Sequence, residues 1–151
     1  MPHVTFCHTL QTLLAGPVDP SVRAKRIAEA IAAERHYRWV GPYEVTSTEI
    51  GMIACTGATP PAFPRFPAAQ GLCGAAVATG SIVNSGNVQE DPRWLTTFGT
   101  TRSEIIVPIF EQGLDRPIGL IDVESDQLNA FSTDDERFLT SCASFLAPLY
   151  R

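Results

Sequence analysis

Three acidic residues fall where two consecutive β-strands are expected to pair. Residues 103–110 and 117–125 are short apolar runs rich in β-branched residues, and turn residues separate them, which predicts an antiparallel hairpin. With the turn centred midway between the runs, Glu104 lies opposite Glu124. Because side chains alternate along a strand, Asp122 points to the same face as Glu124. The sequence therefore gathers three carboxylates on one face of the sheet.

Like charges that face each other across a sheet destabilise it, so such a cluster needs a compensating cation or shared protons. We interpret the cluster as a binding site. Two alternatives remain open. Antiparallel sheets often have one solvated face, on which the acids would only add solubility. A slip of one residue in the register would also separate Glu104 from the other two acids.

Composition and charge limit the class of protein. With 151 residues, 44% hydrophobic and 18% charged, the chain is expected to form one globular domain with its own core. The net charge is −5 and the one basic cluster is Arg23, Lys25 and Arg26, so we expect no nucleic-acid partner. No apolar run approaches transmembrane length and no secretory signal is recognised, so the expected location is cytoplasmic, without a membrane.

The four cysteines do not form a metal-binding pattern. Cys7, Cys55, Cys73 and Cys142 are scattered, and the sequence has neither a CxxC pair nor a Cys/His cluster. Structural zinc is not supported, and we expect no metal or cofactor. In a chain without an export signal the four are expected to be thiols, mostly buried.

Helices are expected at both ends of the chain, with an antiparallel sheet of five or six strands between them, which is an α+β fold. A residue able to cap a helix, Ser21, precedes the second helix, and Ser132 begins a capping-box-like start of the last one. In order, the expected elements are a helix at 4–15, a helix after Ser21, strands at 39–47 and 49–57, a proline-rich cover loop at 58–70, a helix at 71–80, a strand at 81–84, a loop at 87–101, the hairpin, and a helix extending to Leu149.

The chain resembles a GAF domain, in particular the stand-alone members that reduce free methionine-(R)-sulfoxide. Five motifs carry the likeness in order along about residues 20 to 150. They are RWVGPY at 38–43, QGLCGAAVATG at 70–80, RSEIIVP at 102–108, IGLIDVES at 118–125 and FSTDD at 131–135. The resemblance implies a single GAF domain over 1–151, with 1–16 as a helical extension, end helices on one sheet face, a ligand pocket on the other, and a homodimer.

The resemblance also implies a site. In that family a free amino acid lies under a loop cover, with its ammonium group held by inward acids. Glu104 and Asp122 match two of these acids, and Glu124 stands where the family usually has Asp. Trp39 and Tyr43 match the aromatic wall of the pocket.

The redox cysteines of that family are only partly matched. When the chain is aligned on these motifs, Thr97 occupies the position of the attacking cysteine and Phe63 that of a resolving cysteine. Cys73 is the one redox cysteine of the family that this sequence keeps. Sulfoxide reduction needs a thiolate and then a second thiol to form a disulfide. Cys73 begins a helix, whose dipole could lower its pKa, so it could act with an external thiol; the alternative is a small buried residue.

The sequence leads to three functional hypotheses. The first is a small-molecule-binding GAF domain for a free amino acid or similar amino-containing metabolite, with no catalytic residue. The second is a free methionine-(R)-sulfoxide reductase working through Cys73 and an external thiol. The third is a dimeric interaction or signalling module. The expected ligand-binding residues are Trp39, Tyr43, Cys73, Glu104, Asp122 and Glu124.

Overall fold

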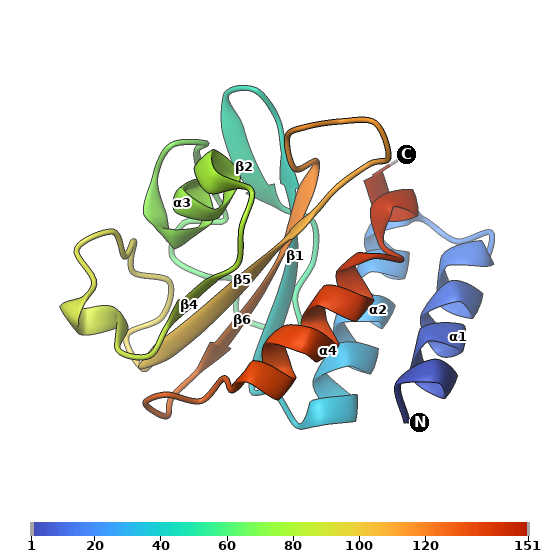
Figure 1. Cartoon of the computed structure of the whole chain (residues 1–151), viewed down its shortest axis with the longest axis horizontal. Helices are drawn as coiled ribbons and strands as arrows, with labels where there is room; N and C mark the ends of the chain where they lie inside the picture. Colours follow the sequence, from blue (N-terminus) through green and yellow to red (C-terminus); the bar gives the residue numbers. More distant parts are fainter. Residues whose placement is uncertain (1, 151) are drawn as a thin grey trace.

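A six-stranded antiparallel sheet forms the centre of the protein, in a computed structural model that describes residues 2–150 (Figure 1). The strands are ordered β3-β2-β1-β6-β5-β4, and neighbouring strands pair antiparallel. The strands are β1 (Trp39–Val45), β2 (Glu49–Met52), β3 (Arg65–Pro67), β4 (Val83–Ser85), β5 (Ser103–Ile109) and β6 (Gly119–Ser125).

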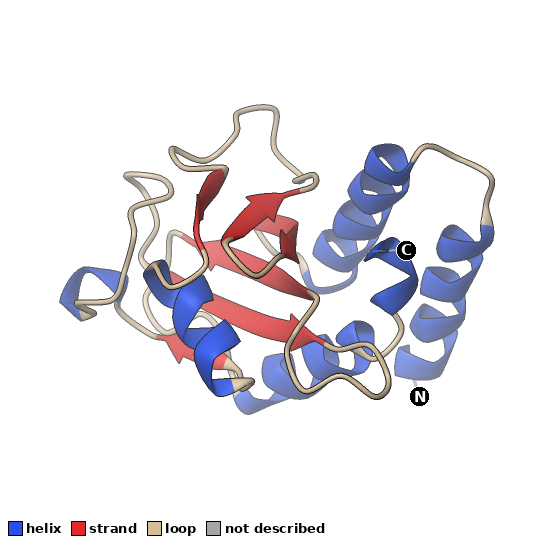
Figure 2. Ribbon diagram, turned by 90° about the horizontal axis from the view of Figure 1, so that it is seen from above, coloured by secondary structure: helices blue, strands red, loops and turns tan. Residues whose placement is uncertain are grey.

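Helices cover the two sheet faces unequally. Three of them pack together on one face, and the short α3 lies on the other face with the long loops, as the view from above shows (Figure 2). The helices are α1 (Pro2–Ala15), α2 (Pro20–Arg35), α3 (Gly71–Thr79) and α4 (Thr133–Ala143), with short 3₁₀ turns η1 (Val88–Glu90) and η2 (Ala147–Tyr150). This arrangement confirms the predicted α+β class, with end helices on one face.

The hairpin has the predicted register. Glu104 pairs with Glu124, and Ile106 pairs with Asp122, in the β5–β6 ladder. Apolar side chains on the opposite face of both strands, including Ile105, pack against the helices. Because a slip of one residue would turn these apolar side chains away from the helices, the packing fixes the register that brings the acids together.

Four elements differ from the prediction. The strand expected at 49–57 ends at Met52. Helix α2 is capped by Asp19 rather than Ser21, since Pro20 fits the first helical position, where no N–H donor is needed. Within the proline-rich loop, Arg65–Pro67 forms a short strand at the edge of the sheet, a position that tolerates proline. Helix α4 stops at Ala143 instead of continuing to Leu149, and Pro148 disfavours a continuous helix there.

Asp135 ties three elements together on the helical face. It forms the predicted capping box with Ser132 at the start of α4, and it accepts hydrogen bonds from Arg35 at the end of α2 (2.9 Å) and from the Tyr37 hydroxyl (2.7 Å). Burial alone would raise the pKa of Asp135, but the hydrogen bonds from Tyr37, Ser132 and Arg35 hold that pKa below its usual value.

The homodimer stays a prediction, and we expect it to involve the end-helix surface. Most of the apolar stripe of the last helix is buried within the chain, including Phe138 and Leu146. The end-helix surface still carries an apolar groove of about 670 Å³, and Leu14, Phe110 and Phe145 are among the residues that line it. Light scattering at micromolar concentration should give the mass of two chains, and a single-chain mass would contradict the expectation.

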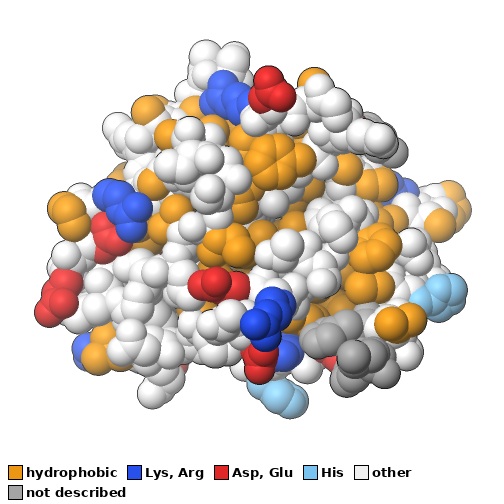
Figure 3. All heavy atoms as spheres, in the orientation of Figure 1, with side chains coloured by type: hydrophobic (Ala, Val, Ile, Leu, Met, Phe, Trp, Pro, Cys, Tyr) orange, Lys and Arg blue, Asp and Glu red, His pale blue; other side chains and the backbone are white. Residues whose placement is uncertain are grey.

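The surface bears on two further expectations, the absence of a membrane and of a nucleic-acid partner. None of the described helices is long and apolar enough to cross a membrane. On the face seen in Figure 3, the Lys and Arg side chains are separated from one another rather than joined in a stripe. The absence of a nucleic-acid partner stays a prediction.

Candidate functional site

The three acids lie on the sheet face that α3 and the loops cover. Glu104, Asp122 and Glu124 are 3%, 1% and 2% exposed. The alternative in which they lie on a solvated face is therefore wrong. Carboxylates are almost never this deeply buried without a partner, so the cluster requires a compensating group.

Strand β1 adds the aromatic residues. Trp39 pairs with Glu124, Gly41 with Asp122 and Tyr43 with Leu120, so these β1 side chains point to the same face as the acids. A Cβ atom at Gly41 would lie 2.5 Å from the Trp39 ring. The missing side chain at Gly41 thus lets the indole lie over the strand, beside Asp122.

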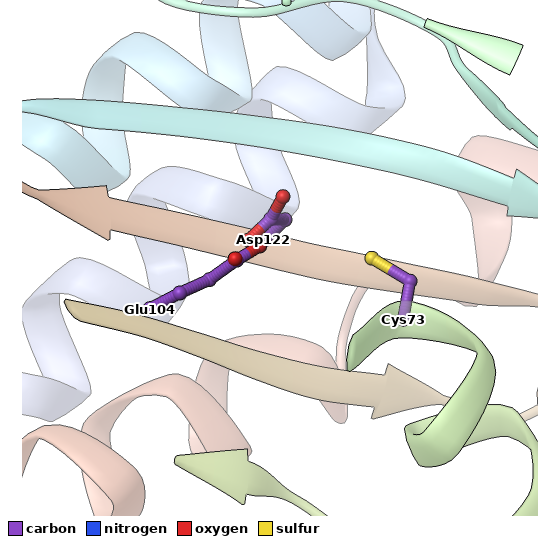
Figure 4. A group of neighbouring side chains, drawn as sticks. All are labelled: Cys73, Glu104 and Asp122. Atoms are coloured by element: carbon purple, nitrogen blue, oxygen red, sulfur yellow. The ribbon is translucent and has the colours of Figure 1, made fainter. Parts of the chain in front are cut away.

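Cys73 reaches the acids from the opposite side of the site. It is the third residue of α3, is 5% exposed, and its sulfur points across to the carboxylates of Glu104 and Asp122 (Figure 4). The Sγ atom and one oxygen of each acid lie within 4.8 Å of one another. Burial, followed by the charges of Glu104 and Glu124, raises the pKa of the thiol well above its usual value. This direction favours the alternative in which Cys73 is a small buried residue.

Two loops close over the acids and hold Glu124. The hydroxyls of Thr97 and Thr101 both donate to Glu124 Oε1, the second at 2.8 Å. Phe98 packs against Trp39 in an edge-to-face (T-shaped) arrangement, with ring centroids 5.5 Å apart. The backbone N–H of Ala62 in the proline-rich loop donates to the carbonyl of Thr97 at 3.0 Å, which joins the two loops.

The proline-rich loop is a cover, as the sequence indicates. Phe66 is buried and packs near Tyr43, with ring centroids 6.1 Å apart, while Phe63 keeps 46% of its surface exposed. The positions that the resemblance assigns to redox cysteines, Phe63, Cys73 and Thr97, line one common void.

The acids raise one another's pKa values. Burial and then the charge of Glu124 raise the pKa of Glu104 to about 8. Burial and the charges of Glu104 and Glu124 raise the pKa of Asp122 well above its usual range, and a hydrogen bond joins the two side chains. Burial also raises the pKa of Glu124, although the hydroxyls of Thr97 and Thr101 favour its charged form. These raised pKa values favour protons shared within the cluster, which a cation would displace.

Two cavities lie beside the acids. The inner void, about 10 Å³, is lined by Tyr43, Phe63, Phe66, Gly71, Leu72, Cys73, Leu95, Thr97, Glu104 and Asp122. The outer chamber, about 200 Å³, is lined by Trp39, Phe98, Thr101 and Glu124, with Arg38 and Asp126 among the remaining residues. Arg38 and Asp126 form an exposed ion pair.

Buried polar atoms without hydrogen-bond partners concentrate around these cavities. Among the described residues they include Trp39 Nε1 and Glu124 Oε2 at the outer chamber, and Tyr43 Oη and Asp122 Oδ1 at the inner void. Native proteins satisfy nearly all such groups, so a local concentration indicates a site for a polar ligand. Each cavity thus has one unpartnered donor group, the Trp39 indole N–H or the Tyr43 hydroxyl, and one unpartnered carboxylate oxygen that can accept.

A larger groove of about 920 Å³ lies on the outer face of α3, bordered by Ala75, Ala78, Arg93 and Arg116. It is open, and none of the unpartnered buried atoms among the described residues belongs to it. Size alone therefore does not locate the site; the chemistry of the lining does.

Sequence reasoning placed all six expected site residues on this face but missed two contributors. Thr101 and Phe98 lie in a polar loop without periodicity, and neither residue type at that spacing carries a signal. Their positions follow only from how the loop closes over β6. The sequence does show that Thr97 lies in this loop, although not that its hydroxyl reaches Glu124.

Comparison with known proteins agrees with this fold. The family model for the GAF domain matches residues 24–148. The chain therefore belongs to the GAF domain family. Two curated relatives are the GAF domain-containing protein A of Dictyostelium discoideum, 29% identical over 137 residues (91% of this chain, 85% of that protein), and Protein YtsP of Bacillus subtilis, 30% identical over 141 residues (91% and 85%).

Among solved structures, two similar ones are free methionine-R-sulfoxide reductases. The type II enzyme of Thermoplasma acidophilum is 34% identical with a TM-score of 0.79, covering 87% of this chain and 95% of that one. The Neisseria meningitidis enzyme, solved in complex with its substrate, is 28% identical with a TM-score of 0.85, covering 98% and 87%.

Proposed function

We propose that this GAF domain binds a small amino-containing metabolite, of the free amino acid class, between its sheet and its cover loops. The observation that carries the proposal is the cluster of buried acids, in which Glu124 presents an unpartnered oxygen at the outer chamber. An ammonium group supplies both the positive charge and the hydrogen-bond donors that this cluster lacks. Charge-assisted hydrogen bonds of this kind contribute about 1.5 to 3 kcal/mol each.

The rest of the ligand occupies the outer chamber. Its volume of about 200 Å³ is below the range of about 300 Å³ upward typical of drug-sized ligands, which suits a small metabolite. Trp39 and Phe98 provide an apolar wall, while the free Trp39 Nε1 donor suits an acceptor on the ligand. Arg38, at the margin of this chamber, suits a carboxylate.

A second candidate is reduction of free methionine-(R)-sulfoxide through Cys73 and an external thiol. The observation in its favour is the 34% identity to a protein described as a free methionine-R-sulfoxide reductase. Against it, Thr97 and Phe63 stand at two of the family's three cysteine positions, and burial raises the pKa of the remaining thiol. We therefore favour binding without this chemistry.

Thermal unfolding with matched ligands tests the binding proposal. We expect L-methionine or L-methionine-(R)-sulfoxide to raise the melting temperature of EDTA-treated protein, because ligand binding stabilises the folded state. The deaminated analogue 4-(methylsulfinyl)butanoic acid should give no shift. Glu124→Gln should weaken binding of the amino acid about 10- to 100-fold, as expected from the loss of one charge-assisted hydrogen bond.

The control for that experiment is Glu34→Gln, which removes an exposed acid from α2 on the opposite face. It should bind like the wild-type protein. A shift of equal size from the deaminated analogue would contradict recognition of the amino group. No shift from any of the twenty common amino acids would contradict the ligand class.

A further inference from the structure

The inner void is surrounded by three side chains that commonly bind metals, and each comes from a different segment. Cys73 lies on α3, Glu104 on β5 and Asp122 on β6, and the three converge from two sides (Figure 4). All three are more than nine-tenths buried. The fold thus builds, from positions far apart in the sequence, a donor set that the spacing of cysteines and histidines does not reveal.

The distances and the volume fit one ion. The thiol sulfur and one oxygen from each acid lie within 4.8 Å of one another. Zinc bonds of about 2.0 to 2.3 Å place tetrahedral ligand atoms about 3.5 Å apart, so inward side-chain shifts of about an ångström complete the site. The void of about 10 Å³ matches the space of about one water-sized atom, far too little for an amino acid.

Unpartnered polar atoms at this void also point to a ligand, and one of them, on Tyr43, lies outside the cluster. Asp122 is 1% exposed, lines the void, and its Oδ1 atom has no hydrogen-bond partner among the described residues. The Tyr43 hydroxyl, in the same lining, is also without one. An ion bound by Asp122 and carrying a water would satisfy both the free carboxylate oxygen and the hydroxyl.

We propose that Cys73, Glu104 and Asp122 bind a divalent metal ion of the zinc type. A thiolate disfavours magnesium and calcium, which take oxygen ligands, whereas zinc accepts sulfur and carboxylate together. Three protein ligands leave a fourth position open to water or to a donor atom of a bound molecule. This site goes beyond the proposed function and does not rest on it, because the amino group is assigned a contact with Glu124, outside the inner void.

Cobalt(II), a spectroscopic substitute for zinc, tests the site in EDTA-treated protein. We expect one cobalt ion per chain, with a sulfur-to-cobalt charge-transfer band in the near ultraviolet that zinc abolishes and excess magnesium does not. Cys73→Ser should remove the band, and Asp122→Asn should lower cobalt affinity at least about tenfold. Cys7→Ser, which alters a remote thiol on α1, should leave the band unchanged.

The outcomes separate this proposal from the binding of amino acids. Glu124→Gln should weaken amino-acid binding but keep the cobalt band. Cys73→Ser should lose the cobalt band but keep amino-acid binding, and it should still unfold cooperatively. Should Cys73→Ser fail to fold, Asp122→Asn with its thiol intact provides the same comparison. Absence of a band in the wild-type protein, or a band that survives in Cys73→Ser, would overturn the proposal.

Discussion

Purified protein supplied with thioredoxin or dithiothreitol will show no turnover of free methionine-(R)-sulfoxide above background. In that reaction one thiolate attacks the sulfoxide sulfur, a second thiol forms the disulfide, and the oxygen leaves as water. Thr97 provides a hydroxyl at the position that the resemblance assigns to the attacking cysteine, and a hydroxyl is neither a thiolate nor a redox centre at neutral pH. Methionine formation, followed by chromatography, measures the rate.

The variant Thr97→Cys sharpens this test. Because Thr97 and Cys73 line the same void, the variant should gain thiol reactivity toward the sulfoxide if the cavity admits it. Thr101→Cys, in the same loop and also directed at Glu124, is the matched control, since it does not line the inner void. Turnover by the wild-type protein that disappears in Cys73→Ser would contradict the prediction and establish the route through a single cysteine.

Glu104→Gln should stabilise the ligand-free protein at pH 8. The ordinary pKa of the carboxyl is 4.5 and the folded pKa is about 8. Between these values the folded state binds more protons than the unfolded state, so the free energy of unfolding of the wild-type protein falls as pH rises from 4.5 to 8. A neutral amide has no such dependence, and its carbonyl oxygen can still accept the hydrogen bond from protonated Asp122.

Urea unfolding at pH 5 and pH 8, in EDTA, measures this effect. We expect Glu104→Gln to exceed the wild-type free energy of unfolding by at least about 1 kcal/mol at pH 8, with a much smaller difference at pH 5. Glu44→Gln, at an exposed position on β1, should follow the wild-type pH dependence. A lower stability of ligand-free Glu104→Gln at both pH values would instead mean that Glu104 anchors its surroundings.

The sheet face could be predicted from the sequence because strand alternation leaves few choices. The alternate apolar side chains of both strands, such as Ile105, face the helices, so Glu104 and Glu124 face the other way, and a turn centred between the strands sets them opposite each other. Alternation likewise puts Trp39 and Tyr43 on one face of their strand, and the resemblance to the family assigned that face to the pocket. Where one face of a strand is buried under helices, the other face is determined as well.

The loops could not be predicted in this way. The contact between Thr101 and Glu124 and the packing of Phe98 on Trp39 depend on how an aperiodic segment closes over the sheet. The choice between the two alternatives for Cys73 also could not be made from the sequence, because the helix dipole is a local property, whereas burial and two distant acids are products of the tertiary fold. The convergence of Cys73, Glu104 and Asp122 likewise has no signature in sequence spacing.

The bond between the two cover loops has a kinetic consequence. Since Ala62 is joined to Thr97, and Thr97 is joined to Glu124, neither loop can lift from the sheet without breaking a link to the other. We therefore expect the two loops to open together, and the inner void to admit a molecule larger than an ion only after they do. Association is then gated, and its rate levels off at high ligand concentration at the rate of opening.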